Sequence, residues 1–155
     1  MQINPFKEMK SCNERGAVKM KENLDKKVKI LLAKIGLDGH DRGVVILSKA
    51  LTDRGMEVIY LGSYRKIKDV VNTAIQEDVD AIGLSFLGGE HLILSERMLK
   101  EMKEKGVNVP LLVGGVIPRE DLSKLRQMGV KEVFISGMPL DRIAERIKEV
   151  VLEAA

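Results

Sequence analysis

A lysine, an aspartate and a histidine share one glycine-rich segment, residues 34–43, which reads Lys-Ile-Gly-Leu-Asp-Gly-His-Asp-Arg-Gly. The segment follows the apolar run 28–33, where the Lys34 ammonium is costly to desolvate unless an acid pairs with it, and Asp38 is the nearest acid. A carboxylate that accepts a hydrogen bond from one imidazole nitrogen leaves the other nitrogen free to bind a metal. We therefore predict that His40 is a metal ligand oriented by Asp38.

Two further segments extend this pattern along the chain. Residues 85–91 read Ser-Phe-Leu-Gly-Gly-Glu-His, and residues 113–118 read Val-Gly-Gly-Val-Ile-Pro. Together with the spacing Asp-x-His-x-x-Gly of residues 38–43, they resemble the cobalamin-binding domains of coenzyme B12-dependent acyl-CoA mutases, methylmalonyl-CoA mutase above all. The resemblance runs from about Lys27 to the end of the chain, and its three segments come in the family's order, each after a predicted strand.

The resemblance implies a role for each of these segments. His40 would be the lower axial ligand of cobalt, with Asp38 on its distal nitrogen and Lys34 behind Asp38. Ser85 would donate to the displaced nucleotide base of the cofactor, and Leu87 would pack against that base. The other residues that the resemblance places near the cofactor are Gly39, Asp41, Arg42, Gly43, Gly89, His91, Gly114, Gly115 and Gly137. At the last strand Met138 stands where many mutases have a hydroxyl residue, which puts one contact to the tail in doubt.

Plainer structural roles compete with several of these assignments. Gly36, Gly39 and Gly43 would admit a flat macrocycle close to the backbone, since glycine has no Cβ and tolerates positive φ. Asp41 and Arg42 would lie near the corrin or simply begin a helix. Ser85 could cap a strand end, and the glycines at 114–115 could form a tight turn. His91 is a second candidate ligand whose alternative is hydrogen bonding at a helix start.

Short β-rich apolar runs alternate with amphipathic stretches of helical length, which predicts βαβ units and a parallel sheet. The predicted strands are 28–35, 57–61, 81–85, 110–113 and 132–135. The predicted helices are 44–54, 67–76, 92–105, 119–128 and 140–151, three of them followed by a capping glycine, at 55, 106 and 129. Five such units indicate a flavodoxin-like α/β fold with sheet order 2-1-3-4-5. The switch in that order brings loops 36–43 and 86–91 to one edge, where ligands bind.

Length and composition limit the classes of protein. A chain of 155 residues fits one domain, predicted here as residues 27–155 behind a flexible arm of residues 1–26. The net charge of +3 lies within residues 1–27, so the domain has no basic stripe, and 3% aromatic residues offer few stacking platforms for nucleic acid. The single cysteine, Cys12, excludes a disulfide framework, and the sequence has no apolar stretch of membrane-spanning length. We expect a cytoplasmic protein without nucleic-acid or membrane partners.

Other proteins with this sheet order need different residues. A phosphoreceiver domain needs an aspartate at the end of strand 3, where this chain has Ser85, and a flavodoxin needs a hydroxyl-rich loop after strand 1. The strongest alternative is a corrinoid carrier for methyl transfer, which uses the same histidine loop. Such carriers usually have a helical cap domain first, and the polar residues 1–26 are too few to build one.

The resemblance therefore implies a cobalamin-binding small subunit of an adenosylcobalamin-dependent acyl-CoA mutase, an isomerase. The chain is too short to include the (β/α)₈ barrel of about 250 residues that would bind the acyl-CoA ester, so a separate large subunit is expected in a hetero-oligomer. Alone, the chain is expected to be inactive. Methylmalonyl-CoA is the first substrate that the resemblance suggests, followed by 2-hydroxyisobutyryl-CoA and other branched esters.

Overall fold

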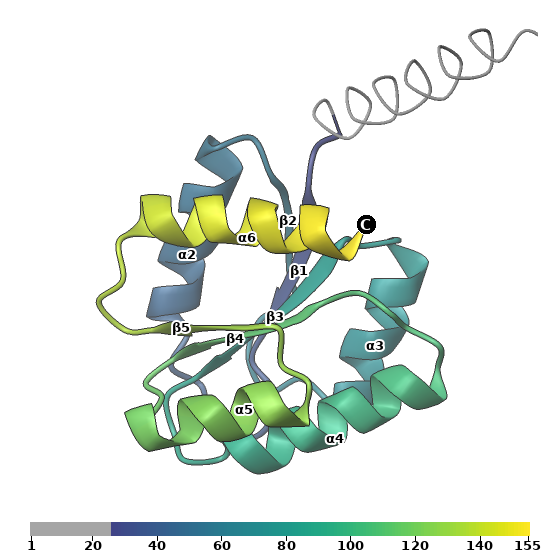
Figure 1. Ribbon diagram of the computed structural model, residues 1–155, viewed down its shortest axis with the longest axis vertical. Helices are drawn as coiled ribbons and strands as arrows, with labels where there is room; N and C mark the ends of the chain where they lie inside the picture. Colours follow the sequence, from purple (N-terminus) through teal and green to yellow (C-terminus); the bar gives the residue numbers. More distant parts are fainter. Residues whose placement is uncertain (1–25) are drawn as a thin grey trace, which may run out of the picture.

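The computed structural model describes residues 26–155, which form a five-stranded sheet enclosed by helices (Figure 1). The strands are β1 (Lys29–Ala33), β2 (Glu57–Tyr60), β3 (Ala81–Phe86), β4 (Leu111–Gly115) and β5 (Glu132–Ile135). The helices are α2 (Arg42–Asp53), α3 (Ile67–Gln76), α4 (His91–Glu104), the 3₁₀ turn η1 (Arg119–Asp121), α5 (Leu122–Met128) and α6 (Leu140–Ala154).

All the strand pairs are parallel, and the sheet order is β2-β1-β3-β4-β5. This confirms the predicted flavodoxin-like order. The order reverses between β1 and β3, where Ile30 pairs with Ala81 and Ala33 with Leu84. The loops after β1 and β3 therefore leave the same edge of the sheet side by side, as the switch-point argument requires.

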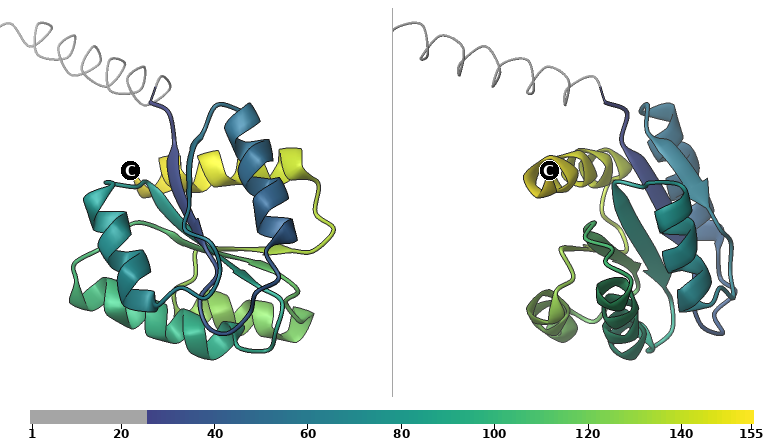
Figure 2. Two further views of the ribbon diagram at one scale, coloured as in Figure 1. Left: turned by 180° about the vertical axis from the view of Figure 1, so that it is seen from behind. Right: turned by 90° about the vertical axis from the view of Figure 1, so that its right-hand side faces the viewer.

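Helices cover both faces of the sheet. Helices α2 and α6 lie over one face, and α3, α4 and α5 lie over the other (Figures 1 and 2). Alternation along β1 shows the division: Ile30 and Leu32 pack with α2 and α6, whereas Leu31 and Ala33 pack with the other three helices. A sheet covered on both faces needs strands that are apolar at almost every position, which is why these runs do not alternate with polar residues.

The element boundaries differ from the predictions by a few residues. Strand β4 continues to Gly115, two residues beyond the predicted end, and the predicted helix 119–128 begins as the 3₁₀ turn η1. The glycines predicted to follow helix ends have left-handed backbones, with φ of 85° at Gly55, 69° at Gly106 and 118° at Gly129. Within residues 26–155, no helix is long and apolar enough to cross a membrane. The predicted arm and Cys12 lie outside the described residues, except for Lys26.

Candidate functional site

Lys34 is the first residue of the loop that leaves β1, and it is fully buried. Its ammonium lies 2.9 Å from Asp38 Oδ2 and donates to the Ser85 carbonyl oxygen at 3.1 Å. The pairing predicted from the sequence is therefore present, and it joins the end of β1 to the end of β3. A buried ammonium is stable only when such partners replace its lost hydration.

Asp38 also holds the histidine of the same loop. Its Oδ1 accepts hydrogen bonds from the His40 backbone N–H and from His40 Nδ1, each at 2.9 Å, and its Oδ2 accepts one from the Leu87 backbone N–H at 3.0 Å. Because an ionised carboxylate can only accept, the proton between Asp38 and His40 belongs to Nδ1. In the neutral imidazole, Nε2 then keeps its lone pair, and the His40 side chain is 78% exposed. The ring presents a free nitrogen outward.

The Asp38 carboxyl stays ionised over the ordinary pH range. Burial acts to raise its pKa, but hydrogen bonds from the His40 backbone, the Lys34 ammonium, the His40 ring and the Leu87 backbone outweigh that effect and hold the pKa well below its ordinary value. Lys34 and Asp38 therefore favour the tautomer of the His40 imidazole that carries its proton on Nδ1.

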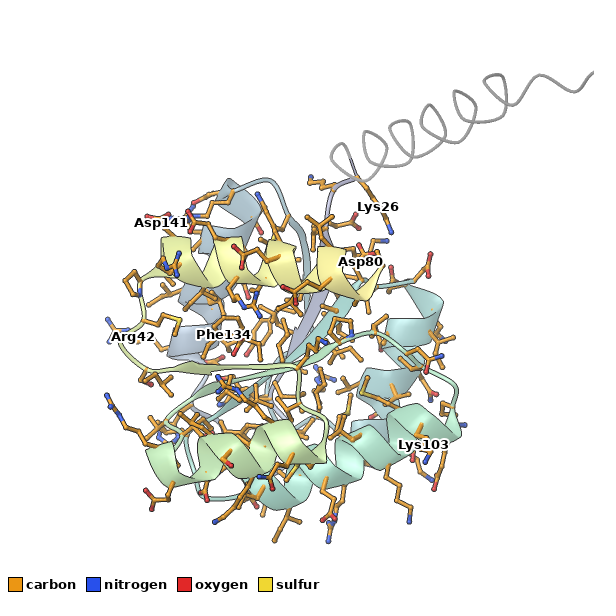
Figure 3. The ribbon with its side chains drawn as sticks, viewed as in Figure 1. Lys26, Arg42, Asp80, Lys103, Phe134 and Asp141 are labelled. Carbon is orange, nitrogen blue, oxygen red and sulfur yellow. The ribbon has the colours of Figure 1, made fainter. Side chains whose placement is uncertain are left out.

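A cavity of about 390 Å³ opens between the sheet and helices α2 and α6; we call it the sheet cavity. Its walls are almost entirely apolar side chains and glycines, and the two hydroxyl residues among them are Ser85 and Ser136. Figure 3 shows one wall residue, Phe134, in the layer between the sheet and α6. The residues that line it from the strands and helices include Ile30, Leu32, Gly43, Val44, Ile46, Leu47, Gly83, Gly114, Gly115, Phe134, Gly137, Met138, Ile143 and Ile147. An apolar group with few polar atoms fits such a space.

A second cavity of about 260 Å³, the loop cavity, lies at the carboxyl ends of the strands. It is lined by Lys34, His40, Arg42, Gly43, Ser85, Phe86, Leu87, Gly115, Val116 and Ser136. Gly43, Ser85, Gly115 and Ser136 line both cavities, so the two spaces adjoin. A ligand over His40 could thus extend into the sheet cavity beneath α2 and α6.

The glycines near the site serve different purposes. Gly43 has open space where a Cβ would stand and lines both cavities, as expected where a ligand approaches the backbone closely. Gly115 has φ of 118°, and a Cβ there would overlap the Phe86 carbonyl, so its tight turn is structural. Gly39 was predicted to admit a macrocycle, but a Cβ on Gly39 would instead overlap the Tyr64 hydroxyl.

Some predicted site residues line only one cavity or neither. His91 is 3% exposed, lines neither cavity, and its Nε2 lies 2.9 Å from Asp121 Oδ2, which fits the alternative of hydrogen bonding at a helix start; its role beside a cofactor stays a prediction. Gly89 lines neither cavity. Asp41 precedes α2 without a side-chain cap and also lines neither cavity. Leu87 is 43% exposed and lines the loop cavity but not the sheet cavity, and its predicted packing against a base stays a prediction.

The sequence reasoning missed Ser136, which lines both cavities at the end of β5. It had looked for a hydroxyl at position 138, where the chain has a methionine that also lines the sheet cavity. It also missed Gly83, whose Cβ would lie 2.6 Å from Leu32 Cδ2. Glycine in the middle of a buried strand signals close approach by another group, and that signal was available.

The donor set limits the chemistry of the site. Among the described residues, no group of three or more His, Cys, Asp or Glu side chains could hold a metal ion. A lone imidazole nitrogen supplies one bond, so a metal bound at His40 must bring its other ligands with it, as a metal inside a macrocycle does. The free Nε2, the loop cavity and the adjoining apolar cavity fit a metallated macrocycle with an apolar appendage.

Comparison with known proteins gives a consistent result. The family described as B12 binding domain matches residues 28–144. The chain is 46% identical over 125 residues to the 2-hydroxyisobutanoyl-CoA mutase small subunit of Aquincola tertiaricarbonis, covering 80% of this chain and 92% of that protein. It is 43% identical over 119 residues to the pivalyl-CoA mutase small subunit of Xanthobacter autotrophicus, covering 76% and 80%.

The fold is also shared with a solved structure. A novel cobalamin-binding protein from Desulfitobacterium hafniense superposes with a TM-score of 0.70 at 22% identity, covering 81% of this chain and 60% of that one. At this identity the likeness concerns the fold alone. The family match covers most of the chain, and the two relatives align along most of their own length. The chain therefore belongs to the B12-binding domain family.

Proposed function

We propose that this chain is the cobalamin-binding small subunit of an adenosylcobalamin-dependent acyl-CoA mutase, with His40 as the lower axial ligand of cobalt. The observation that carries the proposal is the bond between Asp38 Oδ1 and His40 Nδ1, which leaves Nε2 free beside two adjoining cavities. Ligating histidines typically give their other nitrogen to a carboxylate in this way. The names of the two small-subunit relatives support the same assignment.

Each part of the site has a task in this proposal. Asp38 and Lys34 fix the imidazole tautomer and orientation, the loop cavity receives the macrocycle, and the sheet cavity receives its nucleotide tail. Ser85 and Ser136 line both cavities, and in this proposal their hydroxyls would bond polar atoms of that tail. When bound, adenosylcobalamin supplies a weak cobalt–carbon bond whose homolysis starts a radical carbon-skeleton rearrangement.

The relatives also guide the proposals for substrate and partner. We place branched acyl-CoA esters such as 2-hydroxyisobutanoyl-CoA and pivalyl-CoA ahead of methylmalonyl-CoA, because the two small-subunit relatives carry those names. A small subunit implies a large one, and we propose that the large subunit is a barrel that binds the acyl-CoA ester. Turnover should appear only when both chains are mixed, and turnover by this chain alone would contradict this assignment.

The test of the ligand is electron paramagnetic resonance of the full chain with cob(II)alamin. In ¹⁵N-labelled protein, a nitrogen on cobalt changes the superhyperfine pattern from triplets to doublets. We expect this change in the wild-type chain and in His91→Leu, and its loss in His40→Ala. His40 is exposed and its removal takes nothing from the core, so the fold should survive. An unchanged pattern on labelling would refute the assignment of His40.

The alternative of a methyl-transferring corrinoid carrier shares this ligand, so the spectrum does not separate the two functions. Reconstitution does, because a carrier would not restore mutase turnover to a large subunit. The family membership and the fold leave both open, whereas the names of the two relatives favour the mutase.

A further inference from the structure

Tyr64 has an unusual backbone for a large aromatic residue. It lies in the loop between β2 and α3 with φ of 58°, in the left-handed region, and its side chain is 65% exposed. Bulky residues adopt that region rarely, at a cost of about 1–3 kcal/mol. A ring left mostly in solvent gains little burial to offset that cost. The strained backbone of this exposed tyrosine therefore indicates a contact that requires its ring at this position.

That contact is with Gly39, the residue between Asp38 and His40. A Cβ on Gly39 would overlap the Tyr64 hydroxyl and lie 2.7 Å from its Cζ, so the end of the ring lies against the Gly39 backbone. Gly39 is not among the residues with positive φ. A side chain at position 39 would therefore displace the phenol, whereas the backbone turn itself does not need glycine.

The loop that carries Tyr64 is fixed to the strand that begins the histidine loop. The Lys34 backbone N–H donates to the Gly62 carbonyl at 3.1 Å, and the Arg65 backbone N–H donates to the Lys34 carbonyl at 3.0 Å. Ile35 and Arg65 form a parallel bridge. These bonds on both sides of Tyr64 hold its backbone beside the histidine loop, so that the ring, in the rotamer observed, lies against Gly39.

We propose that Tyr64 is a positioning residue that holds the Asp38–Gly39–His40 segment in its ligating conformation before any ligand arrives. The hydrogen bond from the Leu87 backbone to Asp38 ties this segment to the loop after β3, and the Tyr64 ring bears on it from the loop after β2. The hydrogen bond from Nδ1 to Asp38 orients the exposed His40 ring, and this bond depends on the backbone conformation of the segment that Tyr64 contacts at Gly39. The inference rests on the proposed role of His40, which it deepens.

The test is a double-mutant cycle between Gly39→Ala and Tyr64→Asn in the full chain. Asparagine adopts positive φ more readily than tyrosine, so Tyr64→Asn removes the ring without adding backbone strain. Two readouts are taken: the nitrogen NMR signals of the His40 ring without ligand, and the affinity for cob(II)alamin in the histidine-bound state. Tyr64→Phe keeps the ring, and Ile93→Ala removes an apolar side chain that is 59% exposed on α4.

Tyr64→Asn should weaken histidine-bound cob(II)alamin about tenfold, as expected if the ligating conformation falls to roughly a tenth of the population. In the ligand-free protein, the fraction of the His40 ring signal that shows a protonated Nδ1 should fall by a similar factor. Gly39→Ala should do at least as much, and the double variant should be no worse than Gly39→Ala alone, because the collision disappears with the ring. Tyr64→Phe should restore most of the affinity, and Ile93→Ala should change neither readout.

Two results would overturn the inference. One is a Tyr64→Asn variant with unchanged ring signals and affinity, and the other is strict additivity of the two substitutions. The free energy of unfolding, measured in parallel, should change less in Tyr64→Asn than the free energy of cob(II)alamin binding does. If Tyr64 were merely structural, the two free energies would change together. If the wild-type chain does not bind cob(II)alamin, the proposed function fails, whereas the cycle on the ligand-free ring signals still decides the role of Tyr64.

Discussion

Replacement of Lys34 by methionine should destabilise the ligand-free protein by about 3 kcal/mol. Methionine keeps the length and apolar stem of Lys34, which is fully buried, but it removes the charge and the donors. Asp38 Oδ2 would lose its ammonium at 2.9 Å, and the Ser85 carbonyl would lose its donor at 3.1 Å. Removing one partner of a buried ion pair costs about 3–5 kcal/mol. Asp38 keeps three other donors and 11% exposure of its side chain, which favours the lower end of that range.

Urea unfolding followed by circular dichroism measures this loss, since the chain has no tryptophan to report by fluorescence. Equal slopes against urea would show that the comparison of free energies is sound. Lys49→Met is the matched control: Lys49 pairs with Asp53 at the same i,i+4 spacing, but its side chain is 78% exposed, so its loss should cost less than about 1 kcal/mol. Adding Asp38→Asn to Lys34→Met should recover part of the loss, because no unpaired charge is then buried. A Lys34→Met variant as stable as the control would refute the reasoning.

Two further predictions concern regions away from the cavities. Burial acts to raise the pKa of Glu132, but hydrogen bonds from Arg146 and other donors outweigh that effect, so the pKa is lowered overall. The pairing therefore stabilises the protein above the unfolded pKa of about 4.3, and this stabilisation is lost as the pH falls through the folded pKa. Glu132→Gln should therefore be less stable than wild type in urea at pH 7, and the two should become equally stable in acid. Glu149→Gln, at an exposed position, should show little of either effect. If the stability of Glu132→Gln and that of wild type depended on pH in the same way, the result would contradict the pairing. His91→Leu should lower the unfolding free energy by about 1–3 kcal/mol, because it takes a buried partner from Asp121, and should leave cobalt coordination intact; loss of coordination would return His91 to the site.

The sequence was sufficient to predict the fold because its signals were redundant. Each strand is a short apolar run, each of the three glycine caps follows a helix end, and the order of units admits few topologies. The histidine loop was predictable for a related reason: Lys34, Asp38 and His40 lie within seven residues, so their contacts depend on local spacing and little on tertiary structure.

Contacts between distant parts of the chain were not predictable in the same way. His91 is 30 residues from Asp121, and only the tertiary structure brings the start of α4 beside η1 so that the two side chains pair. Gly39 and Tyr64 are likewise brought together by the pairing of two loops, so the reason for glycine at position 39 was assigned to a ligand rather than to a ring. In both cases the residue was singled out from the sequence, but its partner in the fold could not be known.

The sheet cavity follows from side-chain size along alternating strand positions. On β3, Ile82 and Leu84 face α3, α4 and α5, whereas Ala81, Gly83 and Ser85 alternate with them and face α2 and α6. On β4, Val113 faces the first group of helices and Gly114 lines the cavity. Near the carboxyl ends of β3 and β4, small residues therefore leave space on the face toward α2 and α6, although Ile30, Leu32 and Leu112 on that face are large. Packed protein interiors rarely leave such space, so the empty cavity destabilises the ligand-free fold. A bound apolar group would fill the cavity and offset this loss, and ligand binding should therefore raise the stability of the protein.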